Sequence, residues 1–433
     1  MNMVARESLV MWLTRGVAAC QRLSDGKYSA KTVLNYEGER WMSVLYAGGM
    51  IFDGTNTPIQ GHAVLVQGQR IDKVAPVDEF DGFSGRRVET TGGTLMPGLF
   101  DCHVHLCYDG AADPFTAMSK VDDAHIVIRA FRHAQAALRG GVTTTRDCGG
   151  KDYLEFAVRD ACNNGELLGP TIRAAGRMIC MTGGHGNRMG RVADGTDEVV
   201  KAVREQIHAG CDFVKIMATG GVMTPGVNPE DAHYTAEEMA AGIGEAGRFH
   251  RHTASHAQGR DGILNAVRGG IDSIEHGIFM DEVCCEEMKA TGTYLVPTLS
   301  AVNNILRHAD QGIPAYAVEK CQRVAERHRT SVKMYYDAGG RIAMGTDAGT
   351  PFNRHGENAL ELEYMVDIGM SPLDALVSAT STAADLLRES ERGRIKTGCF
   401  ADLLVVNGDP SETITMASKT ENHRLVVKNG VAI

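Results

Sequence analysis

The chain has 433 residues, of which 43% are hydrophobic and 23% are charged. This length exceeds one small domain and suits a large α/β barrel with a smaller partner domain. The formal net charge of −10 argues against a nucleic-acid partner, which usually requires a basic surface. No apolar run approaches the roughly 18–20 residues of a membrane span, so we expect no membrane partner.

The cysteines and the N-terminal segment bear on the compartment. The chain has 11 cysteines and no Cys-x-x-Cys pair, which predicts reduced, buried thiols in a cytoplasmic protein. Val17-Ala-Ala-Cys20 loosely resembles a lipoprotein cleavage site, but Glu7 precedes the apolar stretch and Arg15 interrupts it, so export is the less favoured alternative. A strand-like segment begins at Met42, and we therefore expect residues 1–41 to be a poorly ordered appendage.

Short strands separated by turn residues occupy both ends of the chain. Residues 61–75 predict a hairpin around Gly68, because two alternating apolar segments flank a glycine turn. Near the C-terminus, residues 401–406 and 424–430 are also strand-like. We therefore expect a small β-sandwich domain assembled from residues 42–95 and 390–433.

The middle of the chain, residues 96–389, alternates short apolar strands with helical stretches, which is typical of βα units around a parallel sheet. Eight such units close a (β/α)8 TIM-like barrel of roughly 250 residues. The predicted strands are 98–105, 141–147, 171–179, 212–218, 253–257, 272–276, 293–299 and 341–347. Helical spacing of apolar residues is clearest in 124–139, 197–209 and 235–249.

Histidines and other ligand-type residues stand at the ends of five predicted strands, where barrels of this type carry their active sites. His103 and His105 lie two positions apart, so a strand points both side chains to the same face. The other candidates are Lys215, His256, His276 and Asp347. Each residue alone has a structural interpretation, such as a helix cap for Asp347. The agreement of five strand ends favours a shared site.

Imidazole and carboxylate groups suit Zn²⁺ or a related divalent metal. An ammonium group cannot bind a cation, but burial beside metals would lower the pKa of Lys215. The neutral amine can take up CO2 and become a carbamate, which is a bridging carboxylate. Two metals about 3.5–4 Å apart, bridged by this group and by hydroxide, provide a nucleophile at neutral pH.

These residues resemble the binuclear pattern of the amidohydrolase superfamily, and the resemblance extends from Met42 to the C-terminus. The matching motifs, in chain order, are Phe100-Asp-Cys-His-Val-His105, Lys215 in Val-Lys-Ile-Met-Ala-Thr-Gly-Gly, His256, His276 in Ser-Ile-Glu-His-Gly, and Asp347 in Gly-Thr-Asp. The resemblance implies two zinc ions per chain, with all six residues as ligands and a CO2-derived carbamate on Lys215.

Three further motifs resemble the branch that contains Xaa-Pro dipeptidases, Xaa-Arg/Lys carboxypeptidases and the ochratoxin-hydrolysing amidase. They are Thr182-Gly-Gly-His185, Ile216-Met-Ala-Thr-Gly-Gly221 and Tyr234-Thr-Ala-Glu-Glu238. In that branch, residues at the positions of His185 and Tyr234 are thought to contact the scissile amide or a substrate carboxylate. The segment 186–190 looks shorter than in the peptidases, which bears on dipeptide specificity.

We therefore expect a cytoplasmic, homo-oligomeric enzyme that cleaves an amide bond of an N-acyl amino acid or a dipeptide. A metal-bridging hydroxide attacks the carbonyl, His185 helps to polarise its oxygen, and Asp347 transfers the proton to the leaving nitrogen. Ester, lactone or carbamate hydrolysis at the same centre is an open alternative. A non-catalytic barrel scaffold is disfavoured, because no ligand position is lost.

Overall fold

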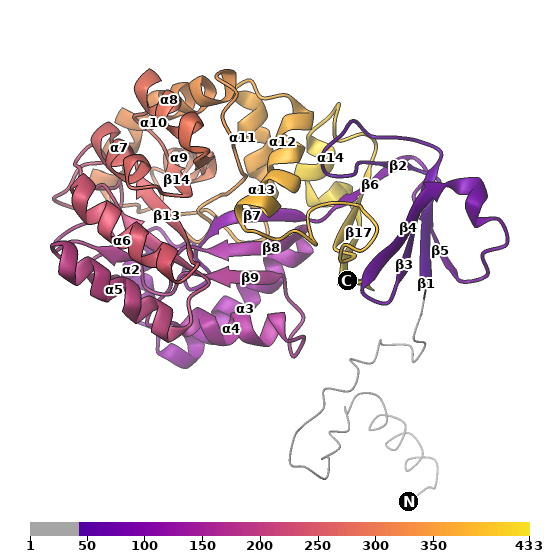
Figure 1. Cartoon of the computed structure of the whole chain (residues 1–433), viewed down its shortest axis with the longest axis horizontal. Helices are drawn as coiled ribbons and strands as arrows, with labels where there is room; N and C mark the ends of the chain where they lie inside the picture. The colour runs from indigo at the N-terminus through magenta and orange to yellow at the C-terminus, as the bar shows by residue number, and fades with distance from the viewer. Residues whose placement is uncertain (1–42) are drawn as a thin grey trace, which may run out of the picture.

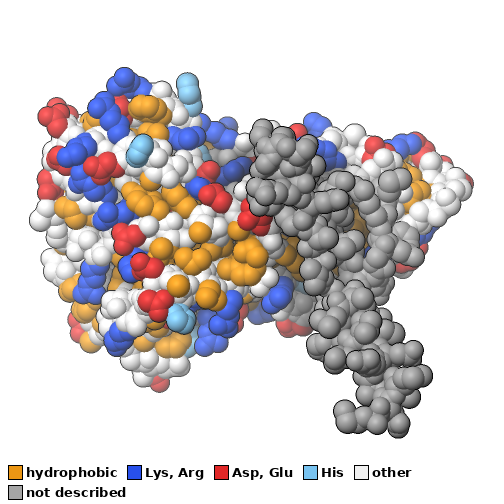
Figure 2. All heavy atoms as spheres, turned by 90° about the horizontal axis from the view of Figure 1, so that it is seen from below, with side chains coloured by type: hydrophobic (Ala, Val, Ile, Leu, Met, Phe, Trp, Pro, Cys, Tyr) orange, Lys and Arg blue, Asp and Glu red, His pale blue; other side chains and the backbone are white. Residues whose placement is uncertain are grey.

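The computed structural model describes residues 43–433, so the predicted appendage over residues 1–41 lies outside the described part of the chain. Within residues 43–433, no helix is both long enough and apolar enough to cross a membrane. On the face shown in Figure 2, Lys and Arg side chains are interspersed with Asp and Glu, and no continuous basic patch covers it.

Parallel strands form the centre of the larger part of the molecule (Figure 1). They fall into two sheets, and almost every strand residue is buried, as expected for strands covered on both faces. The first sheet contains β7 (Leu99–Val104), β8 (Val142–Asp147) and β9 (Thr171–Ala174). The second contains β10 (Ile179–Cys180), β11 (Arg191–Val192), β12 (Phe213–Met217), β13 (His252–Ala257), β14 (Ser273–His276) and β15 (Tyr294–Val296).

Backbone hydrogen bonds connect the two sheets at both of their junctions. The amide of Asp212 donates to Ala174 O at 2.9 Å, beside β9. Residues 341–348 run between β15 and β7, with parallel bridges from Leu295 to Ile342 and from Val104 to Ala348. The observed architecture is an α/β, TIM-like fold.

Two predicted strands differ from the observed ones. Residues 341–347 contain one isolated bridge, at Ile342, and no regular strand, and the segment ends at Asp347 with a φ of 62°, outside the β region. The predicted strand 171–179 is divided into β9 and β10, since Gly176 has a φ of 75° between them. The remaining six predicted strands correspond to β7, β8, β12, β13, β14 and β15.

Helices surround the parallel strands (Figure 1). The three predicted segments are confirmed within one residue as α3 (Asp123–Arg139), α5 (Thr196–Ala209) and α6 (Ala236–Arg248). α6 begins with a capping box in which Thr235 and Glu238 satisfy each other's backbone amides. The other helices used below are α2 (Pro114–Met118), α8 (Glu282–Thr291) and α10 (Ala315–Asp337).

Two smaller sheets, drawn in indigo and yellow in Figure 1, lie beside the parallel strands. The predicted hairpin is confirmed as β3 (His62–Gln67) paired antiparallel with β4 (Arg70–Pro76) in a sheet with β1 (Ser43–Ala47) and β5 (Arg86–Glu89). The second sheet joins both chain ends. It contains β2 (Met50–Ile51), β6 (Gly93–Pro97), β16 (Leu403–Asn407), β17 (His423–Lys428) and β18 (Val431–Ala432). Val66, Leu95, Val405 and Val427 share one buried apolar cluster.

Candidate metal centre

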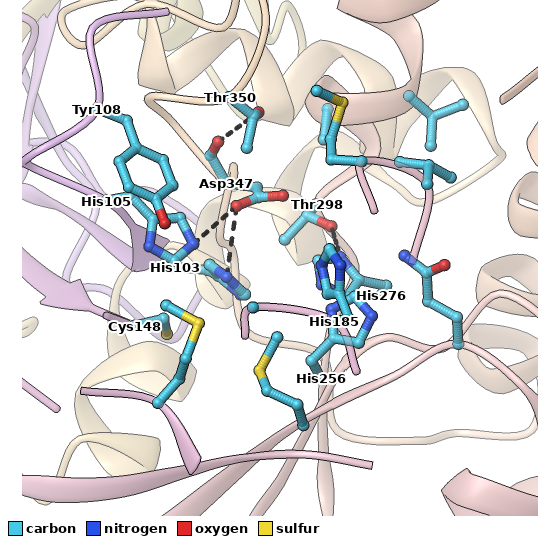
Figure 3. A pocket seen from close by; sticks show the side chains of 18 of the residues that line it. His103, His105, Tyr108, Cys148, His185, His256, His276, Thr298, Asp347 and Thr350 are labelled. Carbon is cyan, nitrogen blue, oxygen red and sulfur yellow. Dashed lines mark hydrogen bonds and ion pairs between the residues drawn. The ribbon is translucent and has the colours of Figure 1, made fainter. Parts of the chain in front are cut away.

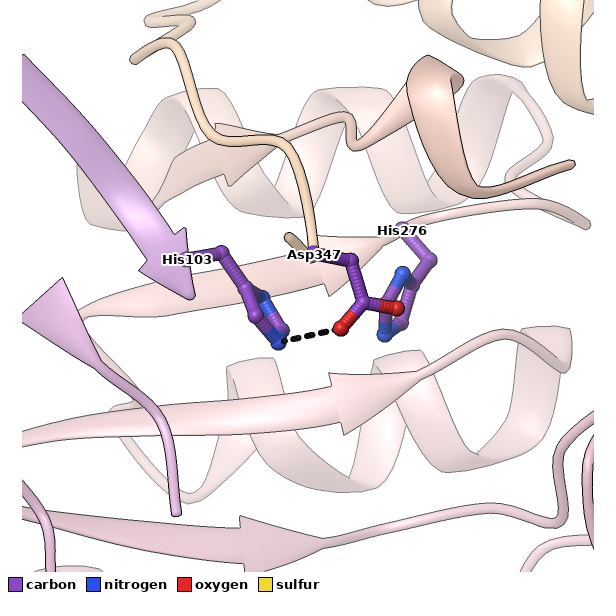
Figure 4. Close-up of side chains that lie close together, drawn as sticks. All are labelled: His103, His276 and Asp347. Atoms are coloured by element: carbon purple, nitrogen blue, oxygen red, sulfur yellow. Dashed lines mark ion pairs between the residues drawn. The ribbon is translucent and has the colours of Figure 1, made fainter. Parts of the chain in front are cut away.

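All six predicted ligand residues line one cavity of about 60 Å³, and Figure 3 labels each of them except Lys215. Figure 4 shows His103, His276 and Asp347 pointing toward one another, and their ligand atoms lie within 4.8 Å of each other. They come from β7, the end of β14 and the segment between β15 and β7. Residues distant in sequence are thus brought to a spacing that can hold a metal ion.

The ligand-type side chains form two neighbouring groups, with Asp347 between them (Figure 3). Asp347 Oδ1 lies 3.2 Å from His105 Nε2 and 3.5 Å from His103 Nε2. On the other side, the ring centroids of His256 and His276 are 4.5 Å apart. The two groups are adjacent, because the rings of His103 and His276 are 5.2 Å apart. Such an arrangement offers donor sets for two ions.

In each candidate ligand histidine, one ring nitrogen lies within hydrogen-bond distance of a supporting residue that is not itself a candidate ligand. The other ring nitrogen is left available to bind a metal. Partners of this kind orient metal-binding histidines in proteins and select their tautomer. The four contacts are His103 Nδ1 with Glu275 Oε2 at 2.8 Å, His105 Nδ1 with Gly149 O at 2.8 Å, His276 Nδ1 with Thr298 Oγ1 at 2.6 Å, and His256 Nε2 with Gly220 O at 2.9 Å.

Lys215 on β12 is the clearest sign that the cavity is built for another group. Its side chain is 2% exposed, and its Nζ has no hydrogen-bond partner among the described residues. A buried ammonium without a partner is costly in free energy, so the bare lysine does not suit this position. A carbamate bound to metal would satisfy the site, and the residues present therefore fit a two-metal centre.

Burial sets the protonation of the histidines. It lowers the pKa of His103, His256 and His276 well below 6.5. The pKa of His105 is raised although burial opposes this, because the Asp347 carboxylate is adjacent. Neutral imidazole is the form that binds a metal, so the environment of the first three rings suits ligands.

Three residues of the site have left-handed backbone conformations that non-glycine residues rarely adopt. The φ angles are 73° at His276, 52° at Thr298 and 62° at Asp347. Each costs about 1–3 kcal/mol and persists only where the surrounding structure holds it, which is characteristic of functional sites. The left-handed turn at His276 also interrupts the alternation of side chains between the two faces of β14. Consecutive residues can therefore both act at the site: Glu275 contacts His103, and His276 lines the cavity.

Asp101 ties together the two segments that carry His103 and Asp347. Its carboxylate accepts hydrogen bonds from the Thr346 hydroxyl at 2.6 Å, from the Asn358 amide at 2.7 Å and from the His103 backbone amide at 3.0 Å. Burial raises the pKa of Asp101 to about 6. The network fixes the segment after β15 against β7 and so places Asp347 beside the histidines.

Of the two predicted substrate-binding residues, the structure brings only His185 to the cavity. Its ring lies 4.4 Å from that of His256, and its Nδ1 is 2.7 Å from Thr224 Oγ1. Burial lowers the pKa of His185 to about 3. Tyr234 lies outside the cavity lining: its side chain is 2% exposed and its hydroxyl donates to Ala193 O at 2.8 Å, and its substrate-binding role stays a prediction.

The rest of the cavity wall is mostly apolar. Its apolar lining residues are Tyr108, Pro114, Phe115, Met178, Met217, Val222, Met223, Ile278, Ala301 and Val302. Among the described residues that line it, Lys215 is the only lysine or arginine. A substrate would therefore place an apolar portion beside the polar centre.

Sequence reasoning missed the residues that support the ligands, namely Asp101, Glu275, Thr298 and Thr224. Asp101 and Glu275 lie inside the motifs that identified His103 and His276, and a search for polar residues next to ligands would have found them. Thr298 follows β15 at a strand end, which is a weaker signal. Nothing in the local sequence around Thr224 indicates its contact with His185.

Comparisons with known proteins agree with this geometry. Residues 94–433 match the model of the amidohydrolase family. An ochratoxinase of Aspergillus niger is 30% identical over 423 residues, covering 90% of this chain and 86% of the relative. A crystal structure of a Xaa-Pro dipeptidase with bound methionine has a TM-score of 0.83 and 33% identity, covering 90% of this chain and 99% of the other.

A third similar protein is a prolidase whose crystal structure contains N-methylphosphonate-L-proline. It has a TM-score of 0.83 and 30% sequence identity, and the match covers 90% of this chain and 99% of the prolidase. The family match includes all six candidate ligand residues and extends through β16, β17 and β18. The chain belongs to the amidohydrolase family and is a hydrolase that acts on amide bonds.

Proposed function

We propose that this protein is a zinc-dependent amidohydrolase that cleaves the amide bond of an N-acyl amino acid or a dipeptide. The observation that carries the proposal is that four candidate ligand imidazoles and one carboxylate line the same cavity as buried Lys215, whose Nζ has no partner among the described residues. The relatives named as ochratoxinase, Xaa-Pro dipeptidase and prolidase support the choice of substrate class. The apolar cavity wall favours substrates with an apolar side chain next to the scissile bond.

In this proposal His103, His105 and Asp347 would hold one ion, and His256 and His276 would hold the other. Lys215 would add CO2 at Nζ and release a proton, and the resulting carbamate would supply a further carboxylate ligand. When bound, the two ions supply Lewis-acid polarisation of the carbonyl and lower the pKa of a water molecule.

The chain's own residues would move the protons. Asp347 Oδ1, which lies 3.2 Å from His105 Nε2, accepts the proton of the attacking water and delivers it to the leaving nitrogen. Since the Thr224 hydroxyl is 2.7 Å from His185 Nδ1, the neutral ring can carry its hydrogen on Nε2 and donate it to the carbonyl oxygen.

The closure of the barrel, the composite β domain, the cellular compartment and the oligomeric state are also part of our proposal. We infer that β7, β8, β9, β12–β15 and residues 341–348 close an eight-stranded barrel within residues 96–389, supported by the hydrogen bonds at both sheet junctions. Residues 42–95 and 390–433 would form one composite β domain. The ten cysteines of the described residues are all buried and free, which supports a cytoplasmic enzyme, and we propose a homo-oligomer.

A combined measurement tests the proposal. Elemental analysis of the purified protein is expected to give about two zinc ions per chain. A screen of N-acyl amino acids and dipeptides, run beside esters, lactones and carbamates, is expected to give the highest kcat/KM for an amide with an apolar residue. A strong preference for an ester or lactone would replace the amide assignment. Absence of both metal and turnover would support a non-catalytic scaffold.

A further inference from the structure

A second hollow lies next to the metal cavity on the same face of the fold. It is a groove of about 290 Å³, and Phe115 of α2 lines both spaces. The other groove residues come from α2 and from loops that follow β8, β9 and β10. Loops after parallel strands form the catalytic face of TIM-like folds, so the groove lies where a substrate would extend.

Three cationic side chains and one carboxylate line this groove: Lys151, Arg177, Arg188 and Asp152. The local excess of positive charge contrasts with the net charge of −10 of the whole chain. Neutral hydroxyl groups of Thr116 and Ser119 complete its polar lining.

The three cations differ in how far they are already satisfied. Lys151 pairs with Asp123 at 2.5 Å. Arg177 donates from Nε and Nη2 to the carbonyls of Met189 and Gly190, which anchors the loop. Arg188 is exposed and forms no hydrogen bond or ion pair with any residue in the range 43–433 that the structure describes.

Arg188 is the cation of the groove that no described side chain pairs with, whereas Lys151 pairs with Asp123 and Arg177 lies 3.9 Å from Asp152. The planar guanidinium of Arg188 suits a carboxylate, which it can bind through two hydrogen bonds.

The metal cavity has no free cationic side chain among its described lining residues that could bind a substrate carboxylate. Among the described residues that line it, the one lysine is assigned to the centre, and the rest of the wall is mostly apolar. Aromatic contacts lead from the centre to the groove. The ring of Tyr108 stacks on His105 at 4.8 Å and meets Phe115 at 5.3 Å. A substrate that leaves the cavity over these rings arrives beside Arg188.

We propose that the groove is an anion subsite in which Arg188, supported by Arg177, binds a side-chain carboxylate of the substrate. This inference rests on the proposed amide hydrolysis and narrows its substrate class. The preferred substrate has an apolar residue at the scissile bond in the cavity and an acidic side chain that reaches past Phe115.

The test uses four dipeptides that differ in one charge: Glu-Met and Gln-Met, and Met-Glu and Met-Gln. Each glutamate and glutamine pair has nearly the same shape, so the ratio of their kcat/KM values isolates recognition of the carboxylate. A hydrogen bond to a charged group corresponds to a preference of about tenfold or more. We expect that preference on one side of the scissile bond, and we expect it to weaken as salt increases.

Three variants assign the preference. Arg188→Gln is expected to bring the ratio to about 1, Arg188→Glu to reverse it, and Arg188→Lys to retain part of it. Arg139→Gln is the matched control, because Arg139 is exposed in the last turn of α3, at the opposite end of the strands, and it should keep the wild-type ratio. Equal kcat/KM values for glutamate and glutamine dipeptides in the wild type, or an unchanged ratio in Arg188→Gln, overturn the subsite.

A binding measurement separates failure of the subsite from failure of the proposed function. If none of these dipeptides is cleaved, the dipeptide part of the proposed function fails, but the groove is still tested by calorimetry with N-acetyl-L-glutamate and N-acetyl-L-glutamine. Binding of the glutamate at least about tenfold more tightly, with loss of that difference in Arg188→Gln, supports the subsite. Equal affinities for the two probes refute it.

Discussion

Nδ1 of His103 lies 2.8 Å from Oε2 of Glu275, and both side chains are almost completely buried. The other oxygen of Glu275 accepts a hydrogen bond from Nη2 of Arg146 at 2.7 Å. Arg146 is itself fully buried and also contacts Ser273 Oγ at 3.0 Å. This network below the cavity orients the His103 ring and keeps its Nε2 free for a metal.

Replacing Glu275 by glutamine should therefore weaken zinc binding by about 10–100-fold, because the carboxylate that supports His103 is lost. Competition with a zinc chelator measures this. Glu282→Gln, at an exposed position of α8, is the control and should bind zinc as the wild type does. Since Arg146 loses its charged partner, circular dichroism must first show that Glu275→Gln is folded. Unchanged zinc affinity in the folded variant would contradict the role of Glu275.

Lys215→Ala should lose the second zinc ion and almost all activity, because the carbamate cannot form. Lys215→Gly with added acetate should recover part of both, since the missing group is chemically a carboxylate. After labelling with ¹³C-bicarbonate, NMR is expected to show a carbamate carbon in the wild type and none in either variant. Lys289→Ala, at an exposed position of α8, is the control. Two zinc ions per chain in Lys215→Ala would exclude the proposed assignment.

Asp347→Asn should retain much of its zinc and lose about 10²–10⁴-fold in kcat, because a neutral amide cannot accept the proton of the attacking water. Elemental analysis and steady-state kinetics on the same preparation separate the two effects. Turnover at the wild-type rate would show that another group transfers the proton. Loss of all zinc would show that the carboxylate contributes mainly as a ligand.

Lys320 of α10 anchors the loop after β12 that carries Thr224. Its Nζ donates to the carbonyl oxygens of Thr224 at 2.7 Å and Val227 at 2.6 Å. Lys320→Met should increase hydrogen exchange over residues 219–232 and lower kcat/KM by about tenfold or more, because these bonds to a charged donor are lost. Lys333→Met on the same helix is the control, since Lys333 pairs only with Asp337. Equal exchange in the two variants would refute the anchoring role.

Asp281 caps α8 and gives a pH dependence of stability. Burial acts to raise its pKa, but hydrogen bonds from Arg260 and from the Cys284 amide lower it from 3.8 to about 2. A lowered folded-state pKa stabilises the protein above about pH 4 and loses this contribution as the pH falls toward 2. Urea unfolding should therefore show a stability deficit of Asp281→Asn at pH 7 that shrinks toward pH 2. A deficit that is constant between these values would contradict the charge effect.

The sequence was sufficient for features that depend on neighbouring residues. Helical periodicity and end signals located α3, α5 and α6 within one residue, and the hairpin of β3 and β4 follows from alternation around a glycine turn. The six candidate ligands were recognisable because each stands at a strand end inside a short motif, and parallel strands bring such ends to one face.

Unusual backbone conformations were the first feature that could not be predicted from the sequence. Strict alternation predicts a regular strand through Asp347 and opposite directions for Glu275 and His276. Because His276 and Asp347 have left-handed φ angles, the strand does not continue through Asp347, and Glu275 and His276 both act at the site. Such conformations are imposed by the packing around each residue. The position of Tyr234 also depends on a distant contact, because its hydroxyl donates to Ala193 O, 41 positions away, and the residue does not line the cavity.

The sequence by itself determined the class of fold, the candidate ligands and the family resemblance, since these rest on local patterns that repeat in chain order. The tertiary structure alone decided which nitrogen of each histidine faces the cavity, how Asp101 and Thr346 join segments 245 positions apart, and that Arg188 shares a groove with Arg177 and Lys151. These relationships depend on contacts between distant parts of the chain, and no local pattern of residues encodes them.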